Sequence, residues 1–161
     1  MKQFVFFFLG LIMFQSAESQ YWQQAVDYTM EVALNHKSAT YSGVQKIVYT
    51  NNSPETLNKV FYHLYFNAFK PGSEMAVRQK NSADKNTRFK ISLDSLTPNQ
   101  QGYLRVSGLT QNGVLLNPVD SETILEVPLH TPIAPGESAL FELTFEGHVP
   151  DVIRRAGKNS S

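Results

Sequence analysis

The chain has 161 residues, 42% of them hydrophobic and 17% charged, a composition typical of one folded domain rather than of a disordered segment. Lys and Arg total 14 and balance the 14 Asp and Glu, so no net field would gather nucleic acid or an anionic membrane surface. The absence of cysteine excludes disulfide bridges, thiolate metal sites and cysteine nucleophiles, so the core alone must hold the fold.

Residues 1–19 have the pattern of a signal peptide. Lys2 precedes an apolar stretch over residues 4–14, which is far shorter than the roughly twenty residues needed to span a hydrocarbon core. Ala17 and Ser19 are small residues of the kind that a signal peptidase requires, so we predict cleavage after Ser19 and an exported chain. An anchor that stays in the membrane is the alternative, and the short stretch disfavours it.

Two neighbouring runs predict a pair of antiparallel strands. Residues 25–34 alternate strictly, with apolar residues on one face and Asp27, Thr29 and Glu31 on the other, which is the pattern of a half-buried strand. Residues 41–52 are rich in β-branched and aromatic residues, and the Asn, Ser and Pro at the end of this run indicate a turn.

Residues 59–67 form a third run in which both alternating sets are apolar, so we predict a central strand covered on both faces. His63 lies in the middle of this run. A catalytic or metal-binding histidine needs partners nearby, and the residues around His63 offer none. We therefore interpret His63 as a buried side chain with a hydrogen-bonded ring, and an active-site histidine in an apolar wall is the alternative.

The second half of the chain continues as a meander. Residues 70–87 lose the apolar periodicity, so we predict a long exposed insertion with a short helical turn around residues 74–79, which could dock a partner. Asn112 and Gly113, after a run at 103–109, give a strong hairpin signal. Further strands are predicted at 114–119, 122–129 and 139–149, with a turn over 130–138.

These runs add up to about seven or eight strands with turn signals between them. The sequence shows neither a sustained helical period nor an internal repeat. We therefore predict an all-β domain, predominantly antiparallel, with a sandwich-like or saddle-like arrangement of sheets.

The histidines do not form a recognisable metal motif. His36, His63, His130 and His148 are each followed by a residue other than Glu, so the zinc-binding pattern H-E-x-x-H does not occur. We expect His36, His130 and His148 to be exposed beside turns. A metal site assembled from distant histidines is the alternative.

Other residue types that could catalyse a reaction fit structural roles better. Ser138 follows Gly136, but Leu140 stands where a nucleophile elbow needs glycine, so we interpret Ser138 as a turn residue. Glu142 and Glu146 share one face of a predicted edge strand, where solvent-facing glutamates are commoner than a pair of glycosidase acids. We predict no catalytic, cofactor-binding or metal-binding residue in this chain.

Three segments together resemble a known family. A strand of the Y-x-x-x-V-x-L kind at 28–34 leads to Tyr41-Ser42-Gly43, an aromatic strand follows, and a pattern of the F-E-L-x-F-x-G kind lies within 139–147. This ensemble resembles the N-terminal β-domain of secreted bacterial M1-family zinc metallopeptidases, the gluzincin aminopeptidases, over residues 21–159. The last residues, including Arg154, Arg155 and Lys158, fit either a solvated terminus or a linker.

The resemblance implies an M1-type β-domain at 20–150 and, at 151–161, the start of a linker to a missing thermolysin-like catalytic domain. The family's G-x-M-E-N and H-E-x-x-H motifs and its Zn²⁺ lie in that second domain, so no residue here inherits a catalytic or zinc-binding role. In the full protein, zinc and a glutamate-activated water would release N-terminal residues from peptide substrates. The fragment alone is expected to be inactive.

A function of a different class stays open beside this one. The chain could be a free-standing exported β-sandwich that binds protein or carbohydrate, with Tyr21, Trp22 and Tyr103 as contacts. Neither of these two functions involves nucleic acid or a stable membrane anchor. Export would end in the periplasm, on the cell surface or outside the cell.

Overall fold

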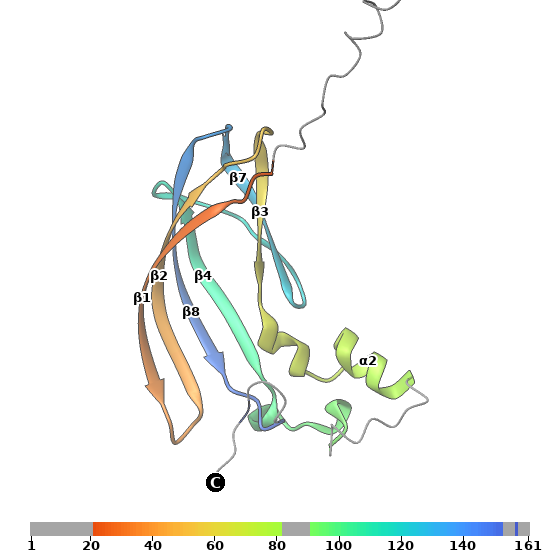
Figure 1. Ribbon diagram of the computed structural model, residues 1–161. Helices are drawn as coiled ribbons and strands as arrows, with labels where there is room; N and C mark the ends of the chain where they lie inside the picture. Colours follow the sequence, from red (N-terminus) through yellow and green to blue (C-terminus); the bar gives the residue numbers. More distant parts are fainter. Residues whose placement is uncertain (1–20, 82–90, 153–156, 158–161) are drawn as a thin grey trace, which may run out of the picture.

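The computed structural model describes residues 21–81, 91–152 and 157, which form two antiparallel sheets with eight strands in all. The sheets lie close together at one end and separate toward the other, where a helix lies (Figure 1). This arrangement confirms the prediction of an all-β, antiparallel fold. The predicted signal peptide and most of the predicted linker lie outside the described residues, so both stay predictions.

The larger sheet, which we call sheet A, has five antiparallel strands, and its central strand comes from the end of the chain. Its strands follow the order β1 (Ala25–Asn35), β2 (Thr40–Thr50), β8 (Ser138–His148), β4 (Tyr103–Gln111) and β5 (Val114–Leu115). The β1–β2 register runs without a break from Ala25 opposite Thr50 to Asn35 opposite Thr40. The predicted antiparallel pairing of these first two strands is therefore confirmed.

The β4–β5 turn is formed by the Asn-Gly pair that signals a hairpin in the sequence. Asn112 has φ 49° and Gly113 has φ 82°, so both residues adopt the positive φ that a type I′ turn requires. The Asn112 side chain also accepts a hydrogen bond from the backbone N–H of Leu140 at 2.9 Å. This contact ties the hairpin to β8.

The smaller sheet, sheet B, has the order β3 (Leu57–His63), β7 (Ile124–Ile133) and β6 (Val119–Ser121). The prediction that residues 59–67 form a central strand covered on both faces is wrong. β3 is an edge strand that ends at His63, and a 3₁₀ turn, η2 (Tyr65–Phe69), follows it. Only one face of β3 packs in the core, through Val60, so Phe61 on the other face remains 53% exposed.

The core lies where sheets A and B face each other. Phe141 of β8 and Val127 of β7 are at most 1% exposed, and they represent the two sides of this contact. The other buried members come from both sheets and the adjoining loops: Ile47, Val60, Leu64, Leu109, Leu116, Leu125, Ile133, Ala139 and Leu143. Burial of this apolar surface is the main stabilising contribution in a chain without disulfides.

A second, smaller cluster lies beside the sheets. Its residues come from η2, helix α2 (Glu74–Asn81), the 3₁₀ turn η3 (Leu93–Ser95) and nearby loops. A further 3₁₀ turn, η4 (Pro98–Gln100), follows η3. Phe69, Ala76 and Leu93 pack together in this cluster. The helical turn predicted around residues 74–79 is thus confirmed, and residues 82–90 of the predicted insertion lie outside the described residues.

Candidate functional site

Two of the sequence patterns that carry the family resemblance lie side by side in sheet A. Tyr41 is opposite Gly147 across the β2–β8 pair, and Gly43 is opposite Phe145. The rings of Tyr41 and Phe145 are neighbours, with centroids 6.2 Å apart. We call these four residues the aromatic–glycine square.

Close neighbours require glycine at both positions of the square. A Cβ on Gly147 would lie 2.7 Å from Cε1 of the Tyr41 ring. A Cβ on Gly43 would overlap the backbone oxygen of Glu31 on β1 and would lie 2.8 Å from Cζ of Phe145. Real Cβ atoms essentially never come so close to another heavy atom. An aromatic ring that packs on a glycine in the neighbouring strand also shields the glycine backbone from solvent.

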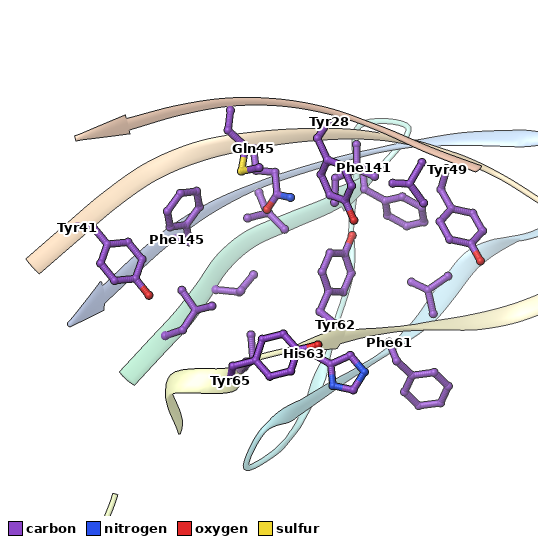
Figure 2. A pocket seen from close by; sticks show the side chains of 18 residues that line it. Tyr28, Tyr41, Gln45, Tyr49, Phe61, Tyr62, His63, Tyr65, Phe141 and Phe145 are labelled. Atoms are coloured by element: carbon purple, nitrogen blue, oxygen red, sulfur yellow. The ribbon is translucent and has the colours of Figure 1, made fainter. Parts of the chain in front are cut away.

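An apolar groove opens beside the square, between the inner face of sheet A and strand β3. Its volume is about 430 Å³. Figure 2 shows side chains from both sheets around it, with the hydroxyls of Tyr28 and Tyr62 pointing toward each other. The other lining residues are Val26, Met30, Tyr41, Gln45, Ile47, Tyr49, Val60, Phe61, His63, Leu64, Tyr65, Leu104, Val106, Phe141, Leu143 and Phe145.

Burial raises the pKa of three tyrosine hydroxyls that line the groove. Burial, with a smaller contribution from Tyr103, raises the pKa of Tyr41 to about 12. Burial also raises the pKa of Tyr62, with a smaller contribution from the neighbouring Tyr28. Burial alone raises the pKa of Tyr49. These groups are therefore neutral hydrogen-bond donors at physiological pH, and the groove combines apolar walls with a few polar tips.

The inner face of β1 extends this apolar surface beyond the groove. Tyr28, Met30, Val32 and Leu34 are 52–68% exposed, although large apolar side chains usually seek burial. The predicted alternation of the two faces is correct, but the expectation of a half-buried strand is wrong. Beyond the end of sheet B, nothing in the described residues covers this part of sheet A.

His63 is exposed at the rim of the groove, so its interpretation as a buried core residue is wrong. Its ring stacks on Tyr65 with centroids 5.2 Å apart and an interplanar angle of 7°. No carboxylate or nucleophile in the described residues forms a hydrogen bond with it. The arrangement is that of an aromatic contact surface, and it lacks the partners that acid–base catalysis needs.

The outer face of sheet A is polar. Lys46 pairs with Glu142 at 2.8 Å, and Arg105 pairs with Glu146 at 3.0 Å. β8 is a central strand rather than the predicted edge strand, yet both glutamates face solvent as predicted. Four residues along a strand span about 13 Å, more than the roughly 5 to 9.5 Å between the two acids of a glycosidase.

The remaining histidines are not brought together. His36 and His130 are exposed, as expected, whereas the expectation for His148 is wrong because it is only 9% exposed. Its Nδ1 donates to the Gln101 carbonyl at 2.7 Å, which fixes the ring against the end of β4. The described residues contain no group of three or more His, Asp or Glu that could hold a metal ion.

The three aromatic contacts suggested for a stand-alone binding module do not form one site. Tyr21 and Trp22 precede β1 at the open end of the β1–β2 hairpin, whereas Tyr103 lies level with the turn of that hairpin. The groove residues themselves were missed. Each groove strand was predicted, but the sequence holds no signal for the gap between the sheets.

Comparisons with known proteins found similarity only among solved structures. No protein-family model and no curated protein matches the chain. The chain is similar to a two-domain M1 zinc metallopeptidase, a mutant bound to L-tryptophan, and to an M1 zinc metallopeptidase from Deinococcus radiodurans. In both cases the sequence identity is 18% and the TM-score 0.48, over 79% of this chain and 21% of the other. The chain thus spans about a fifth of these structures.

The helices in the described part of the chain are too short or too polar to cross a bilayer.

Proposed function

We propose that this chain is the N-terminal β-domain of an exported M1-type zinc metallopeptidase, and that it supports the active site without supplying a catalytic residue. The observation that carries the proposal is the aromatic–glycine square. The two sequence patterns that resemble the family lie about a hundred residues apart in the chain, yet their aromatic residues and glycines meet in adjacent strands. The two patterns are therefore explained together, because their side chains pack into one cluster.

The uncovered inner face of β1 and the groove also support the proposal. Exposed contiguous apolar surface on a domain marks a place where another domain or a partner packs. We infer that a thermolysin-like catalytic domain of the same protein covers part of this surface. In that arrangement the β-domain would form one wall of the cavity that receives the peptide substrate.

Zinc chemistry belongs, in this proposal, to the catalytic domain. There the metal would polarise the scissile carbonyl while a glutamate activates the attacking water, and an aminopeptidase would release N-terminal residues from peptides. The described residues of this chain do not fit a zinc site, because they contain no suitable cluster of ligands. We therefore assign the chain no step of the reaction.

The first test is to read the coding DNA beyond the codon for Ser161. An open frame that continues into G-x-M-E-N and H-E-x-x-H is the expected result. The longer product should then hydrolyse aminoacyl p-nitroanilides, lose this activity with a chelator and regain it with zinc. Residues 20–161 alone should be inactive and hold no stoichiometric zinc. A stop codon after Ser161 in an intact gene, or turnover by residues 20–161, would contradict the proposal.

The groove favours a second candidate, a free-standing exported binding module. A concave apolar site with a few hydroxyl groups is the usual form of a small-molecule site. A chain of this kind should be a stable monomer, and ligands that fill the groove should raise its melting temperature. A domain that has lost its neighbour should instead bind the dye ANS through its exposed apolar face.

A further inference from the structure

We propose that β1 is a docking edge for an extended strand of another protein, one whose side chains alternate between apolar residues and lysine or arginine. The inference depends on the exposed strand itself and does not require a catalytic domain. Its three supports are the open backbone edge, the apolar inner face and the unpaired acids of the outer face.

The backbone of β1 is open along one side. β1 is the first strand in the order of sheet A, and in the described residues it pairs only with β2. In an antiparallel edge strand every other residue directs its N–H and C=O away from the sheet. Eleven residues in unbroken register make β1 a long and regular template for a further strand.

The other edges are irregular, short or already bonded to other groups, and β1 is none of these. β3 has a register shift next to Lys59, and β6 is only three residues long. On the far side of sheet A, β4 has a register shift after Ser107, and its Leu104 N–H donates to the Asn67 side chain. Proline, lysine and bulges protect sheet edges, and β1 contains none of them.

The inner face of β1 predicts apolar residues on one face of the incoming strand. Side chains directly opposite each other in neighbouring strands lie about 5 Å apart and stabilise the pair when both are apolar. Tyr28, Met30, Val32 and Leu34 present such side chains at the open edge, each more than half exposed. An added strand would cover them with its own apolar set.

The outer face of β1 predicts basic residues on the other face of that strand. Asp27 and Glu31 form no ion pair in the described part of the chain, and their neighbours on β2 are Val48 and Val44. The cation between those valines, Lys46, is bound to Glu142 on the far side of β2. The carboxylates of Asp27 and Glu31 can therefore form ion pairs with basic side chains of an added strand.

A second copy of this chain does not fit the edge. Two β1 strands paired antiparallel with the same face outward would place Asp27 and Glu31 of both copies on one ladder. Like charges opposite each other destabilise a strand pair. The charge pattern therefore favours a strand from another protein over self-pairing.

The test uses a synthetic peptide in which valine and lysine alternate, titrated into the isotopically labelled chain. We expect saturable binding, with alternate amides of β1 becoming protected from hydrogen exchange. A matched peptide with glutamate in place of lysine should bind at least tenfold more weakly. A peptide methylated on the backbone nitrogens that face β1 should not bind, because it cannot complete the ladder.

Variants of the chain separate charge from backbone pairing. D27N/E31Q should weaken binding of the lysine peptide by about fivefold to tenfold, because two cross-strand charge pairs are lost. D27K/E31K should reverse the preference in favour of the glutamate peptide. Both variants change exposed side chains, and their melting temperatures serve as the check on folding.

Four outcomes would overturn the proposal. They are equal binding of the two peptides, protection confined to the groove or to other strands, no binding at all, and protection of β1 without peptide in a chain that sediments as a dimer. The last result would assign the edge to self-association. None of these outcomes decides whether a catalytic domain follows, because that test depends on the gene and on zinc-dependent turnover.

Discussion

Asn51 is a single residue that joins the two sheets, and its side chain is fully buried. Its Nδ2 donates to the carbonyl oxygens of Glu55 at 2.7 Å and Ile133 at 2.9 Å. Its Oδ1 accepts from the backbone N–H and the hydroxyl of Ser53, at 3.0 and 2.6 Å. The amide thus uses both of its donors and its acceptor to hold the end of β2 against the end of β7.

Asn51→Asp should destabilise the fold by about 2 to 3 kcal/mol, because a carboxylate keeps the shape but leaves two buried carbonyls without a donor. Asn52→Asp is the matched control, since Asn52 is exposed and makes one side-chain hydrogen bond, to the Gln23 carbonyl. Urea denaturation followed by circular dichroism measures both changes. Similar losses at the two positions would contradict the assigned role of Asn51.

Gly147 is predicted to depend on the ring of Tyr41. Gly147→Ala should cost about 1 to 3 kcal/mol, because the new methyl group would overlap the Tyr41 ring in a buried position. In a Tyr41→Ala background the same change should cost less than about 1 kcal/mol, since the obstacle is gone. A double-mutant cycle on the free energy of unfolding tests this, and additive effects would show that the two residues are not coupled.

Tyr41 should also make stability depend on alkaline pH. Its pKa is raised to about 12 in the folded chain from an ordinary value of 10.0, so its contribution is complete below pH 10 and is lost as pH rises through 12. Because the side chain is only half-buried, solvent screens this contribution, and the loss between pH 10 and 12 is about 1 kcal/mol. Tyr41→Phe should make the fall in unfolding free energy over this pH range shallower by about that amount, with Tyr21→Phe as the control. Parallel curves for wild type and Tyr41→Phe would contradict this.

At the scale of the strands, the sequence predicts which residues share a face but not what covers that face. Alternation at 25–34 correctly separates the apolar and acidic faces of β1, yet only Val26 is partly buried, because sheet B does not reach across the rest of the strand. The doubly apolar pattern of β3 predicts a central strand, whereas its partner β7 lies on one side only. Burial is set by the neighbouring sheet, which local periodicity does not encode.

The contrast between β1 and β3 can be measured with a valine-to-alanine substitution in each strand. Val32→Ala on the exposed face of β1 should change the unfolding free energy by less than about 0.5 kcal/mol. Val60→Ala on β3 should cost about 1.5 to 3 kcal/mol, because Val60 is 9% exposed and packs in the core, whereas Val32 is 58% exposed. Equal costs would mean that the inner face of β1 is covered in solution, for example by self-association.

At the scale of the molecule, turn chemistry and strand count are enough to predict the fold class. The Asn-Gly hairpin and most of the strands follow from local patterns, but the single strand predicted at 114–119 is two short strands, β5 and β6, in different sheets. The groove does not follow from local patterns, because it arises where the two sheets diverge and its walls come from five strands distributed over most of the chain. The burial of His148 also depends on residues far away in the sequence, so the turn-like residues around it do not predict that it is buried.

The whole domain is predicted to bind the dye ANS in its native state, because apolar surface remains open along β1 and the groove. Met30→Lys with Val32→Lys should remove most of the fluorescence, since both side chains lie on the inner face. Val44→Lys with Val48→Lys is the matched control, because these valines are 45% and 42% exposed but lie on the outer face. If the proposed catalytic domain covers the inner face, the longer protein should bind less dye per molecule than residues 20–161. An equal loss in both double variants would show that the dye does not report on the inner face.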